Sequence, residues 1–370
     1  MARRPRSGRR YRDAGKRRLG GQPFRRRHRR LITGVTTVLV LLMGSVAGYA
    51  YHLNAQLNQF GRVDISAVGD GDVDPDEGRA LNILLLGSDQ GEGSEGGDSI
   101  EEDAAAASWP SGKYRSDTLM VVHIPRDRSA VHLVSIPRDT YTDILDEDGE
   151  VQSREKINAA FSTYGPRGAV NTVEALTGLS IDHLAIIDWA GFKDITTAVG
   201  GVEVFIPNTF YDPSQKIRWE AGDQVLEGER ALQYVRTRYG LLRGDFDRIA
   251  RQQNFMRSVM NKMLSRGVLA NPVSLANTLG ALADNMTLDS GWSTGNLRNL
   301  ALSLRGVGSG TVNFLTAPVA TTEELAGVGS IVRLDEARAT ELWQAIASDT
   351  IQTYLDAYPD EELGSDREIA

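Results

Sequence analysis

The sequence predicts an α/β fold in which a mixed β-sheet is covered by helices. Runs rich in Val, Leu and Ile occupy residues 81–87, 118–124 and 130–136, and each has the length of a strand. Beyond residue 154 helix-prone segments alternate with further strands, which is the pattern of an α/β sandwich. The sequence contains no fixed-period repeat, so a solenoid is excluded.

The first 51 residues predict a membrane anchor. Residues 1–30 carry thirteen Arg and one Lys against the single acid Asp13, and residues 31–51 carry no charged side chain. A helix rises about 1.5 Å per residue, so this run would span about 30 Å, the thickness of the hydrocarbon core of a bilayer. The basic arm should then stay cytoplasmic and the remaining chain should be exported. A cleaved signal peptide is the main alternative, but its apolar region is usually only about 7–15 residues long.

Charge and cysteine content restrict the partners. Subtracting the 14 basic residues and one acid of the arm from totals of 41 and 49 leaves 27 basic and 48 acidic residues. A general affinity for polyanions is therefore not expected, and nucleic acid is not an expected partner. The arm is better explained by membrane topology and by attraction to anionic lipid. The absence of cysteine rules out disulfides and thiolate chemistry, but a domain this long can bury a sufficient core without crosslinks.

The two strands at 118–124 and 130–136 predict a hairpin. In an antiparallel pair the start of the first strand lies beside the end of the second, so Asp117 and Arg138 should lie close together. The turn residues 125–129 belong to the other end, about 23 Å away at about 3.3 Å per residue, and are expected to be solvated charge. The tetrapeptide Ile-Pro-Arg-Asp occurs at both ends, but only its second copy shares an end with Asp117.

The run 81–87 predicts a strand buried on both faces. It is followed by Gly-Ser-Asp, which places Asp89 just past the strand end, and then by a long Gly-, Glu-, Ser- and Ala-rich loop at 90–114. Sequential strands are often neighbours in a sheet, so Asp89 should join Arg115 and Asp117 at one edge.

Later elements follow from turn and cap signals. The predicted elements are a helix at 154–176 interrupted near Gly165-Pro166 and stopped by Gly178, a strand at 183–187, a helix at 189–199 capped by Asp188, a strand at 202–206, helices at 227–234 and 245–265, and a strand at 311–315. The methionines at 256, 260 and 263 form a helical stripe that predicts core packing. His123, His132 and His183 lie in or at strands and are interpreted as core or strand-edge residues.

Taken one at a time, the Arg and Asp residues are weak signals, because a lone surface ion pair contributes only about 0–1 kcal/mol. Together, several Arg and two Asp would suit a magnesium-bridged pyrophosphate, since Arg gives bidentate donors to phosphate and carboxylates hold a hard cation. No nucleophile elbow, phosphate-binding P-loop or dinucleotide fingerprint occurs in the sequence.

Six motifs, taken together and in order, resemble the LytR-CpsA-Psr family. They are GSD at 87–89, RSDT at 115–118, SIPRDT at 135–140, KINAAF at 156–161, LEGERALQYVRTR at 226–238 and DFDRIARQ at 245–252. The resemblance covers residues 80–266. It implies a mixed sheet between helices, with a polyprenyl chain in an apolar groove and its pyrophosphate at the mouth.

The resemblance also implies an activity and a site. The activity would be transfer of a glycopolymer from undecaprenyl pyrophosphate to the 6-hydroxyl of peptidoglycan muramic acid, outside the membrane. Asp89 and Asp117 would hold Mg²⁺, or Mn²⁺ in its place. The residues implied to grip the phosphates are Arg115, Arg138, Arg236, Arg238, Arg248 and Gln252, with Arg115 and Arg138 as the catalytic pair.

The predicted organisation is a basic arm at 1–30, a span at 31–51, a linker at 52–79, a catalytic domain at 80–350 and an acidic, frayed tail at 351–370. The expected partners are the lipid-linked glycan, peptidoglycan and membrane lipid. Two other functions stay open from the sequence: a pyrophosphatase that releases lipid phosphate to water, and a non-catalytic sensor of polyprenyl phosphates.

Overall fold

The computed structural model describes residues 44–45, 47–65, 78–90, 99–106, 108–237 and 245–364. Two compact units divide the chain, residues 1–52 and 53–370. Among the described helices, none combines the length and the apolar character needed to cross a bilayer. The predicted arm at 1–30 and most of the predicted span at 31–51 lie outside the described residues.

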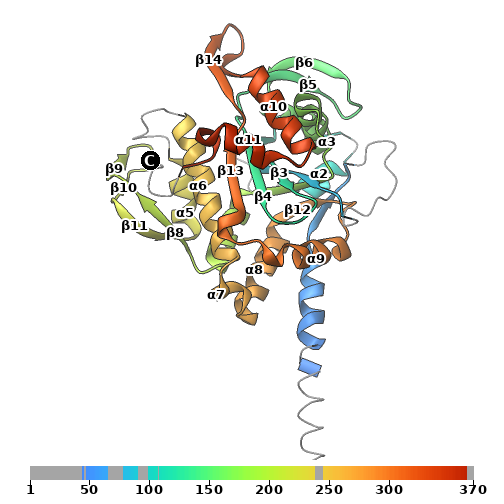
Figure 1. Ribbon diagram of the computed structural model, residues 1–370, viewed down its shortest axis with the longest axis vertical. Helices are drawn as coiled ribbons and strands as arrows, with labels where there is room; N and C mark the ends of the chain where they lie inside the picture. The colour runs from blue at the N-terminus through green and yellow to red at the C-terminus, as the bar shows by residue number, and fades with distance from the viewer. Residues whose placement is uncertain are drawn as a thin grey trace, which may run out of the picture. The chain divides into compact units, whose positions relative to one another are not determined.

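A mixed seven-stranded sheet forms the centre of the unit 53–370 (Figure 1). Three neighbouring pairs, β1–β12, β7–β2 and β4–β13, are parallel, and the other pairs are antiparallel. The strands in spatial order are β1 (Gly61–Val63), β12 (Met286–Asp289), β7 (His183–Asp188), β2 (Leu81–Gln90), β3 (Tyr114–Ile124), β4 (Val131–Ile136) and β13 (Val312–Thr316).

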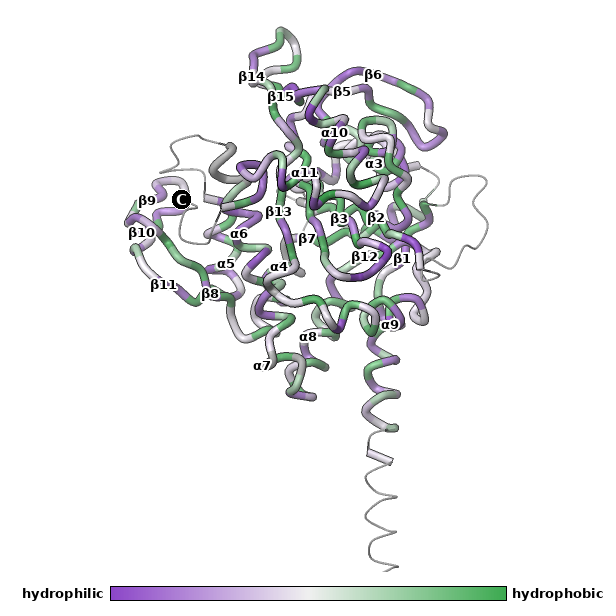
Figure 2. Tube along the Cα trace, viewed as in Figure 1, coloured by the Kyte–Doolittle hydropathy of each residue, from purple (hydrophilic) through white to green (hydrophobic). Residues whose placement is uncertain are grey.

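Both faces of this sheet are buried because successive apolar side chains point to opposite sides of each strand. On β2, Leu84 and Leu86 belong to one hydrophobic cluster, whereas Ile83 and Leu85 belong to the cluster on the other face. The apolar character of β2 and β3 is visible as green tube in Figure 2. This arrangement confirms the predicted α/β sandwich.

Helices cover each face of the sheet. Apolar residues of α3, α10 and α11 pack into the first cluster, and those of α6, α8 and α9 pack against the second. The bounds are α3 (Asn158–Thr177), α10 (Glu336–Ala347), α11 (Ile351–Ala357), α6 (Asp245–Met263), α8 (Pro272–Asn285) and α9 (Thr294–Ser303).

Smaller elements surround this sandwich. A third cluster joins α4, α5 and part of α6 to the antiparallel pair β8–β11. The peripheral elements are α2 (Ile100–Ala104), β5 (Tyr141–Leu145), β6 (Val151–Lys156), α4 (Trp189–Ala198), β8 (Val202–Ile206), β9 (Phe210–Asp212), β10 (Ile217–Trp219), β11 (Gly222–Leu226), α5 (Gly228–Arg236), α7 (Arg266–Leu269), β14 (Val319–Leu325) and β15 (Gly329–Leu334).

Most predicted element boundaries are confirmed within a few residues. Asp188 caps α4 by accepting a hydrogen bond from the backbone N–H of Gly191 at 2.5 Å. Helix α3 is interrupted at Gly165, whose φ of 69° is left-handed, and ends at Gly178, whose φ of 70° forms a left-handed C-cap. Glycine tolerates positive φ, so the sequence predicts both the interruption and the end of this helix.

Three predictions are wrong. Residues 154–156 are not helical but end strand β6, which pairs with β5. Strand β1 lies inside the predicted linker 52–79 and pairs with β12, so the fold begins before residue 80. Helix α11 lies in the predicted frayed tail, where Ile351, Tyr354 and Leu355 are buried in the first cluster.

Candidate functional site

The open end of the β3–β4 hairpin brings Asp117 and Arg138 together. The register pairs Leu119 with Ile136, so Asp117 lies two residues before the paired segment and Arg138 two residues after it. The Arg138 guanidinium forms an ion pair with the Asp117 carboxylate. The prediction that topology selects the second Ile-Pro-Arg-Asp copy is thus confirmed.

A β-bulge positions Asp117. In the β2–β3 ladder Gly87 pairs with Thr118, but the next residue, Ser88, pairs with Ser116, so Asp117 has no partner of its own. A bulge adds one residue to a strand and redirects its side chain locally, and bulges recur beside active sites. Gly87 also lacks a Cβ, which would lie only 3.0 Å from the Cβ of Thr118.

Four charged side chains form a cluster at this end of the sheet, and we call Asp117, Arg138, Asp139 and Lys156 the mouth cluster. Arg138 Nε lies 3.7 Å from Asp139 Oδ2, and Lys156 Nζ lies 3.3 Å from Asp139 Oδ1. Each of the four side chains is between 20% and 24% exposed, so the charges are partly desolvated yet open to a ligand. Their formal charges sum to zero.

The backbone around the mouth cluster is held by hydrogen bonds. The N–H of Asn158 donates to the carbonyl of Arg138 at 3.2 Å, and the N–H of Ile157 donates to the carbonyl of Thr140 at 2.8 Å. These bonds connect the start of α3 to the segment that carries Arg138 and Asp139. The site therefore rests on ordered backbone at the edge of the core.

Lys156 is a site residue that sequence reasoning missed. Its segment was predicted to begin a helix, whereas Lys156 is the last residue of β6 and pairs with Tyr141. The KINAAF motif, which starts at Lys156, was the available signal. Asp139 lies at the centre of the mouth cluster, between Arg138 and Lys156.

An apolar pocket lies next to the β-bulge that carries Asp117. Gly87 and Thr118, which flank the bulge at Asp117, form part of its wall. Asp188 and Gln252 add polar groups at the wall, and most other lining residues are aliphatic, Phe or Met. The remaining lining residues are Leu85, Leu86, Met120, Ile187, Phe192, Ile195, Thr196, Val235, Met256, Val259, Met260, Met263 and Leu282.

The methionine stripe of α6 lines this pocket. Met256, Met260 and Met263 are only half-buried, although they also pack against the two neighbouring hydrophobic clusters. The prediction of core packing was therefore incomplete. Methionine is unbranched and polarizable, so its side chains can adapt to a flexible apolar ligand.

The other predicted site residues that the structure describes lie outside the mouth cluster, and only one of them lines the pocket. The backbone of Asp89 lies within β2, opposite Arg115 on β3, and not past the strand end; only its backbone is described. Arg115 is exposed. Gln252 lines the pocket and donates to the carbonyl of Val235 at 3.4 Å. Arg236, next to Val235, is exposed at the end of α5.

The side chains of two predicted site residues lie outside the described part of the structure. Arg238 lies outside the described residues, and the side chain of Arg248 is likewise not described, although its backbone is helical in α6. One more Arg of the same motif has a structural position: Arg251 is 2% exposed, with its guanidinium 4.8 Å from the ring centre of Phe210 and 5.1 Å from that of Tyr234. Burial raises the pKa of the Tyr234 hydroxyl, and the Arg251 charge opposes this.

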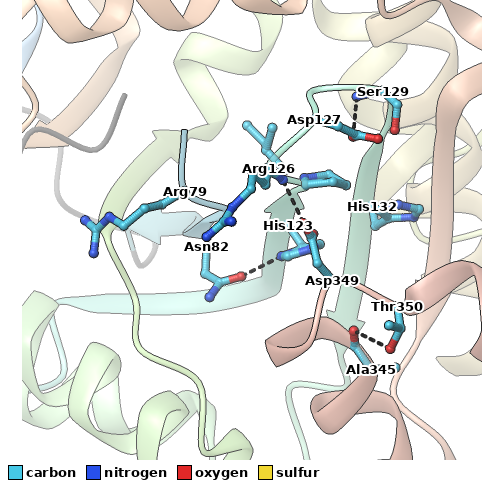
Figure 3. A network of polar contacts seen from close by, with 12 residues as sticks. Arg79, Asn82, His123, Arg126, Asp127, Ser129, His132, Ala345, Asp349 and Thr350 are labelled. Carbon is cyan, nitrogen blue, oxygen red and sulfur yellow. Dashed lines mark hydrogen bonds and ion pairs between the residues drawn. The ribbon is translucent and has the colours of Figure 1, made fainter. Parts of the chain in front are cut away.

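The turn end of the hairpin has a structural role (Figure 3). The backbone N–H of Arg126 donates to Asp349 Oδ2 at 2.9 Å, and His123 Nε2 lies 3.0 Å from Asp349 Oδ1. Arg128 donates to the backbone carbonyls of Arg79 and Pro125, both at 2.8 Å. The side chain of Arg126 is exposed, as predicted, but Arg128 holds the turn and is not merely solvated.

The three strand histidines are buried, as predicted. His183 Nδ1 lies 3.0 Å from Asp289 Oδ2, and its ring stacks on Trp292 at 4.4 Å between centroids. Burial lowers the pKa of His123, and burial together with the nearby His123 lowers the pKa of His132 to about 4. Both rings are thus neutral near pH 7 and serve the core.

The oxygen ligands that the mouth cluster offers would fill only part of the coordination shell of a hard cation. Asp117 and Asp139 offer carboxylate oxygens, and the backbone of Asp89 lies two residues along the ladder from the bulge. Among the described residues no group of three or more His, Cys, Asp or Glu could hold a metal ion. Mg²⁺ typically uses one or two carboxylates with water and substrate phosphate, so this donor set is compatible with it.

Comparison with known proteins identifies one family for this fold. Residues 47–348 match the model of the LytR_cpsA_psr family. The chain belongs to the LytR-CpsA-Psr family. This match includes all the motifs that carried the resemblance and the whole of the mouth cluster and pocket.

Relatives of this LytR-CpsA-Psr protein function at the cell wall according to their names. Cell wall biosynthesis protein LcpA of Corynebacterium glutamicum is 32% identical over 92% of this chain and 68% of LcpA. The polyisoprenyl-teichoic acid–peptidoglycan teichoic acid transferase TagU of Enterococcus faecalis is 31% identical, covering 72% of this chain and 78% of TagU. The crystal structure of Bacillus subtilis TagV has a TM-score of 0.58 at 25% identity, covering 76% of this chain and 98% of TagV.

Proposed function

We propose that this protein transfers a glycopolymer from a polyprenyl pyrophosphate carrier to peptidoglycan. It is a transferase of the LytR-CpsA-Psr family, and relatives named for teichoic acid transfer support this reaction class. One observation carries the proposal: the wall of an apolar pocket includes Gly87 and Thr118, and Thr118 directly follows Asp117, which forms an ion pair with Arg138. A molecule with a long apolar chain and an anionic head matches both parts.

The pocket accounts for the lipid half of the donor. Its lining is almost entirely apolar, and burying a hydrocarbon chain there is favourable by about 25 cal/mol per Å² of apolar surface removed from water. The pyrophosphate would then lie near Thr118 and Gln252, next to Asp117. Undecaprenyl pyrophosphate is the carrier that the family resemblance implies.

The Arg side chains account for the head group. Arg138 offers a planar set of donors that suits phosphate, and its guanidinium stays positively charged near neutral pH, so it stabilises negative charge and does not act as a base. Arg115 and Arg236 are exposed and close in sequence to mouth and pocket residues, and Arg238 and Arg248 extend the same role. Electrostatic stabilisation of this kind is often the largest contribution to catalysis.

The reaction balances as a phosphotransfer. The 6-hydroxyl oxygen of a muramic acid forms a bond to the phosphorus that carries the glycan. The bond from that phosphorus to the bridging oxygen breaks, so polyprenyl phosphate leaves and a phosphodiester joins glycan to peptidoglycan. The hydroxyl proton passes to a carboxylate, for which Asp139 and Asp117 are the described candidates.

Magnesium is part of the proposal. Asp117 and Asp89 would hold it, and it would supply positive charge to the phosphate oxygens. We further propose that the chain is anchored by residues 31–51 with the domain outside the membrane, because peptidoglycan is the acceptor.

Purified protein with a lipid-pyrophosphate glycan, Mg²⁺ and peptidoglycan tests the function. Glycan joined to muramic acid is the expected product. Phosphate release that needs no acceptor would instead identify a pyrophosphatase, and binding of donor without turnover would identify a sensor. A matched reaction with Arg138→Ala should form joined glycan at least about 100-fold more slowly.

A further inference from the structure

The surface made by the end of α6 and by α7, α8 and α9 differs in charge from the rest of the exported chain. We call residues 262–306 the α7–α9 face. Residues 267–283 carry no charged side chain, and no acid occurs between Asp289 and Glu323. Of the two acids on this face, Asp289 is buried against His183. The chain as a whole beyond residue 30 is strongly acidic, so this depletion is local.

Basic and apolar side chains share the outer side of α9 and of the 3-10 helix η1 (Leu304–Gly306) that follows it. Leu297, Leu300 and Leu304 pack inward on the second hydrophobic cluster. Arg298, Leu302 and Arg305 recur at intervals of four and three residues, lie on the opposite side of the helical turn and are exposed. Neither of these two arginines forms an ion pair with a described residue.

Large apolar side chains are exposed on this face. Leu302 on α9 is 58% exposed, and Val273 in the first turn of α8 is 66% exposed. Exposed apolar side chains rimmed by basic ones are typical of protein surfaces that contact anionic membranes. Helices α7, α8 and α9 lie along one side of the folded unit in Figure 1.

The chain enters the folded unit at this face. Gln56 donates from Nε2 to the backbone carbonyl of Ala276 on α8 at 3.0 Å. Thr294, the first residue of α9, donates to Asn58 Oδ1 at 2.6 Å. The first residues of the unit 53–370 are therefore held against α8 and α9.

The apolar pocket reaches the same region. Met260 and Met263 near the end of α6, and Leu282 on α8, belong to its wall, while Thr118 and Asp188 belong to the part of its wall on the sheet. Helix α7 connects α6 to α8. A lipid chain that rises from a membrane on the α7–α9 face would thus meet the apolar wall directly.

We propose that the α7–α9 face docks on the anionic surface of the bilayer, with Val273 and Leu302 inserted among the lipids and Arg298 and Arg305 against their head groups. This inference rests on the membrane-bound donor and anchor of the proposed function. Docking would hold the pocket against the membrane and allow the polyprenyl chain to pass into it without crossing water.

Residues 53–370 without the anchor isolate this contact. No residue before Leu57 belongs to the hydrophobic clusters of the described part, so this fragment retains the complete core. The probe is co-sedimentation with vesicles of phosphatidylglycerol and phosphatidylcholine, compared with pure phosphatidylcholine. We expect binding to the anionic vesicles that weakens as salt is added.

Matched double variants locate the contact. Arg298→Gln with Arg305→Gln should weaken binding about tenfold, because basic residues near an anionic surface each strengthen it. Arg154→Gln with Arg218→Gln removes the same charge from exposed residues elsewhere and should have little effect. Val273→Ser with Leu302→Ser should also weaken binding, whereas Val151→Ser with Val225→Ser, which are 60% and 64% exposed, should not.

Failure of this proposal can be distinguished from failure of the proposed function. Equal binding by the face variants and their controls, or no binding to anionic vesicles at all, would overturn docking. Donor binding in detergent, measured on the same variants, should be unchanged because none of the substituted residues lines the pocket. Arg138→Ala should lower the rate of transfer at least about 100-fold but keep vesicle binding.

Discussion

Replacement of Arg138 by alanine tests the site most directly. In the mouth cluster, Arg138 and Lys156 balance Asp117 and Asp139, so the variant changes the formal charge of these four side chains from zero to −1. An anionic pyrophosphate must then approach a site of its own sign. At 4 Å and an effective dielectric constant near 20, one unit charge interacts with another by about 4 kcal/mol.

This interaction energy indicates how far the rate of transfer should fall in Arg138→Ala. Loss of one preorganised charged donor costs about 3–4 kcal/mol of transition-state stabilisation, which lowers kcat/KM by about 100- to 1000-fold. Arg138→Lys restores the charge but not the paired donors of the guanidinium. Its kcat/KM should therefore lie between that of Arg138→Ala and that of the natural protein.

The assay is transfer of a radiolabelled glycan from its lipid pyrophosphate to peptidoglycan. Arg154→Ala is the matched control, because Arg154 is an exposed arginine whose ion pair with Asp143 lies on the β5–β6 hairpin. Thermal unfolding of each variant separates loss of function from loss of fold. Transfer by folded Arg138→Ala at the rate of the Arg154→Ala control would refute the assignment of the mouth cluster.

Three further predictions concern the pocket, the core and the helix kink. Met260→Trp should fill part of the pocket and weaken binding of a long-chain polyprenyl donor about tenfold, while a short-chain donor binds as before; equal effects on both donors would contradict the pocket assignment. His132 has a pKa of about 4 in the fold against about 6.5 when unfolded, so the unfolded state binds more protons below pH 6.5 and stability should fall from there toward pH 4 by about 3 kcal/mol. Urea unfolding across this pH range should show a smaller decrease for His132→Gln, and an identical decrease would count against the histidine. Gly165→Ala should destabilise the protein by about 1–3 kcal/mol, because its φ is 69° and a Cβ would lie 2.8 Å from Trp109 Cδ2; Gly178→Ala, with a similar φ but no atom within 4 Å of its Cβ, should cost less, and the reverse order would exclude the Trp109 contact as the cause.

Much of the fold could be predicted because its signals are local. The strands of the hairpin and β7 are runs of apolar residues, and the ends of α3 and α4 carry a left-handed glycine and a capping aspartate. The elements that were missed lack such signals. Strand β6 is largely exposed and is defined by its pairing with β5, and β1 is a three-residue edge strand that pairs with β12 far along the chain.

Composition also concealed one helix. The last twenty residues are acidic overall, which predicts a frayed tail, but Ile351, Tyr354 and Leu355 lie at helical spacing and are buried. A few apolar side chains on one face are enough to dock a short helix onto an existing core. The average charge of a segment carries no information about the spacing of its apolar residues, so the composition did not predict this helix.

By itself, the sequence determined that Asp117 and Arg138 would meet, because the two ends of an antiparallel hairpin are defined by chain direction alone. Only the tertiary structure decided that Lys156 completes the mouth cluster and that Met256, Met260 and Met263 line a pocket. A helical stripe of methionines has the same periodicity whether it faces packed side chains or a cavity. The difference depends on how far α6 lies from the strands and helices opposite it, and that distance is set by contacts between segments remote in the chain.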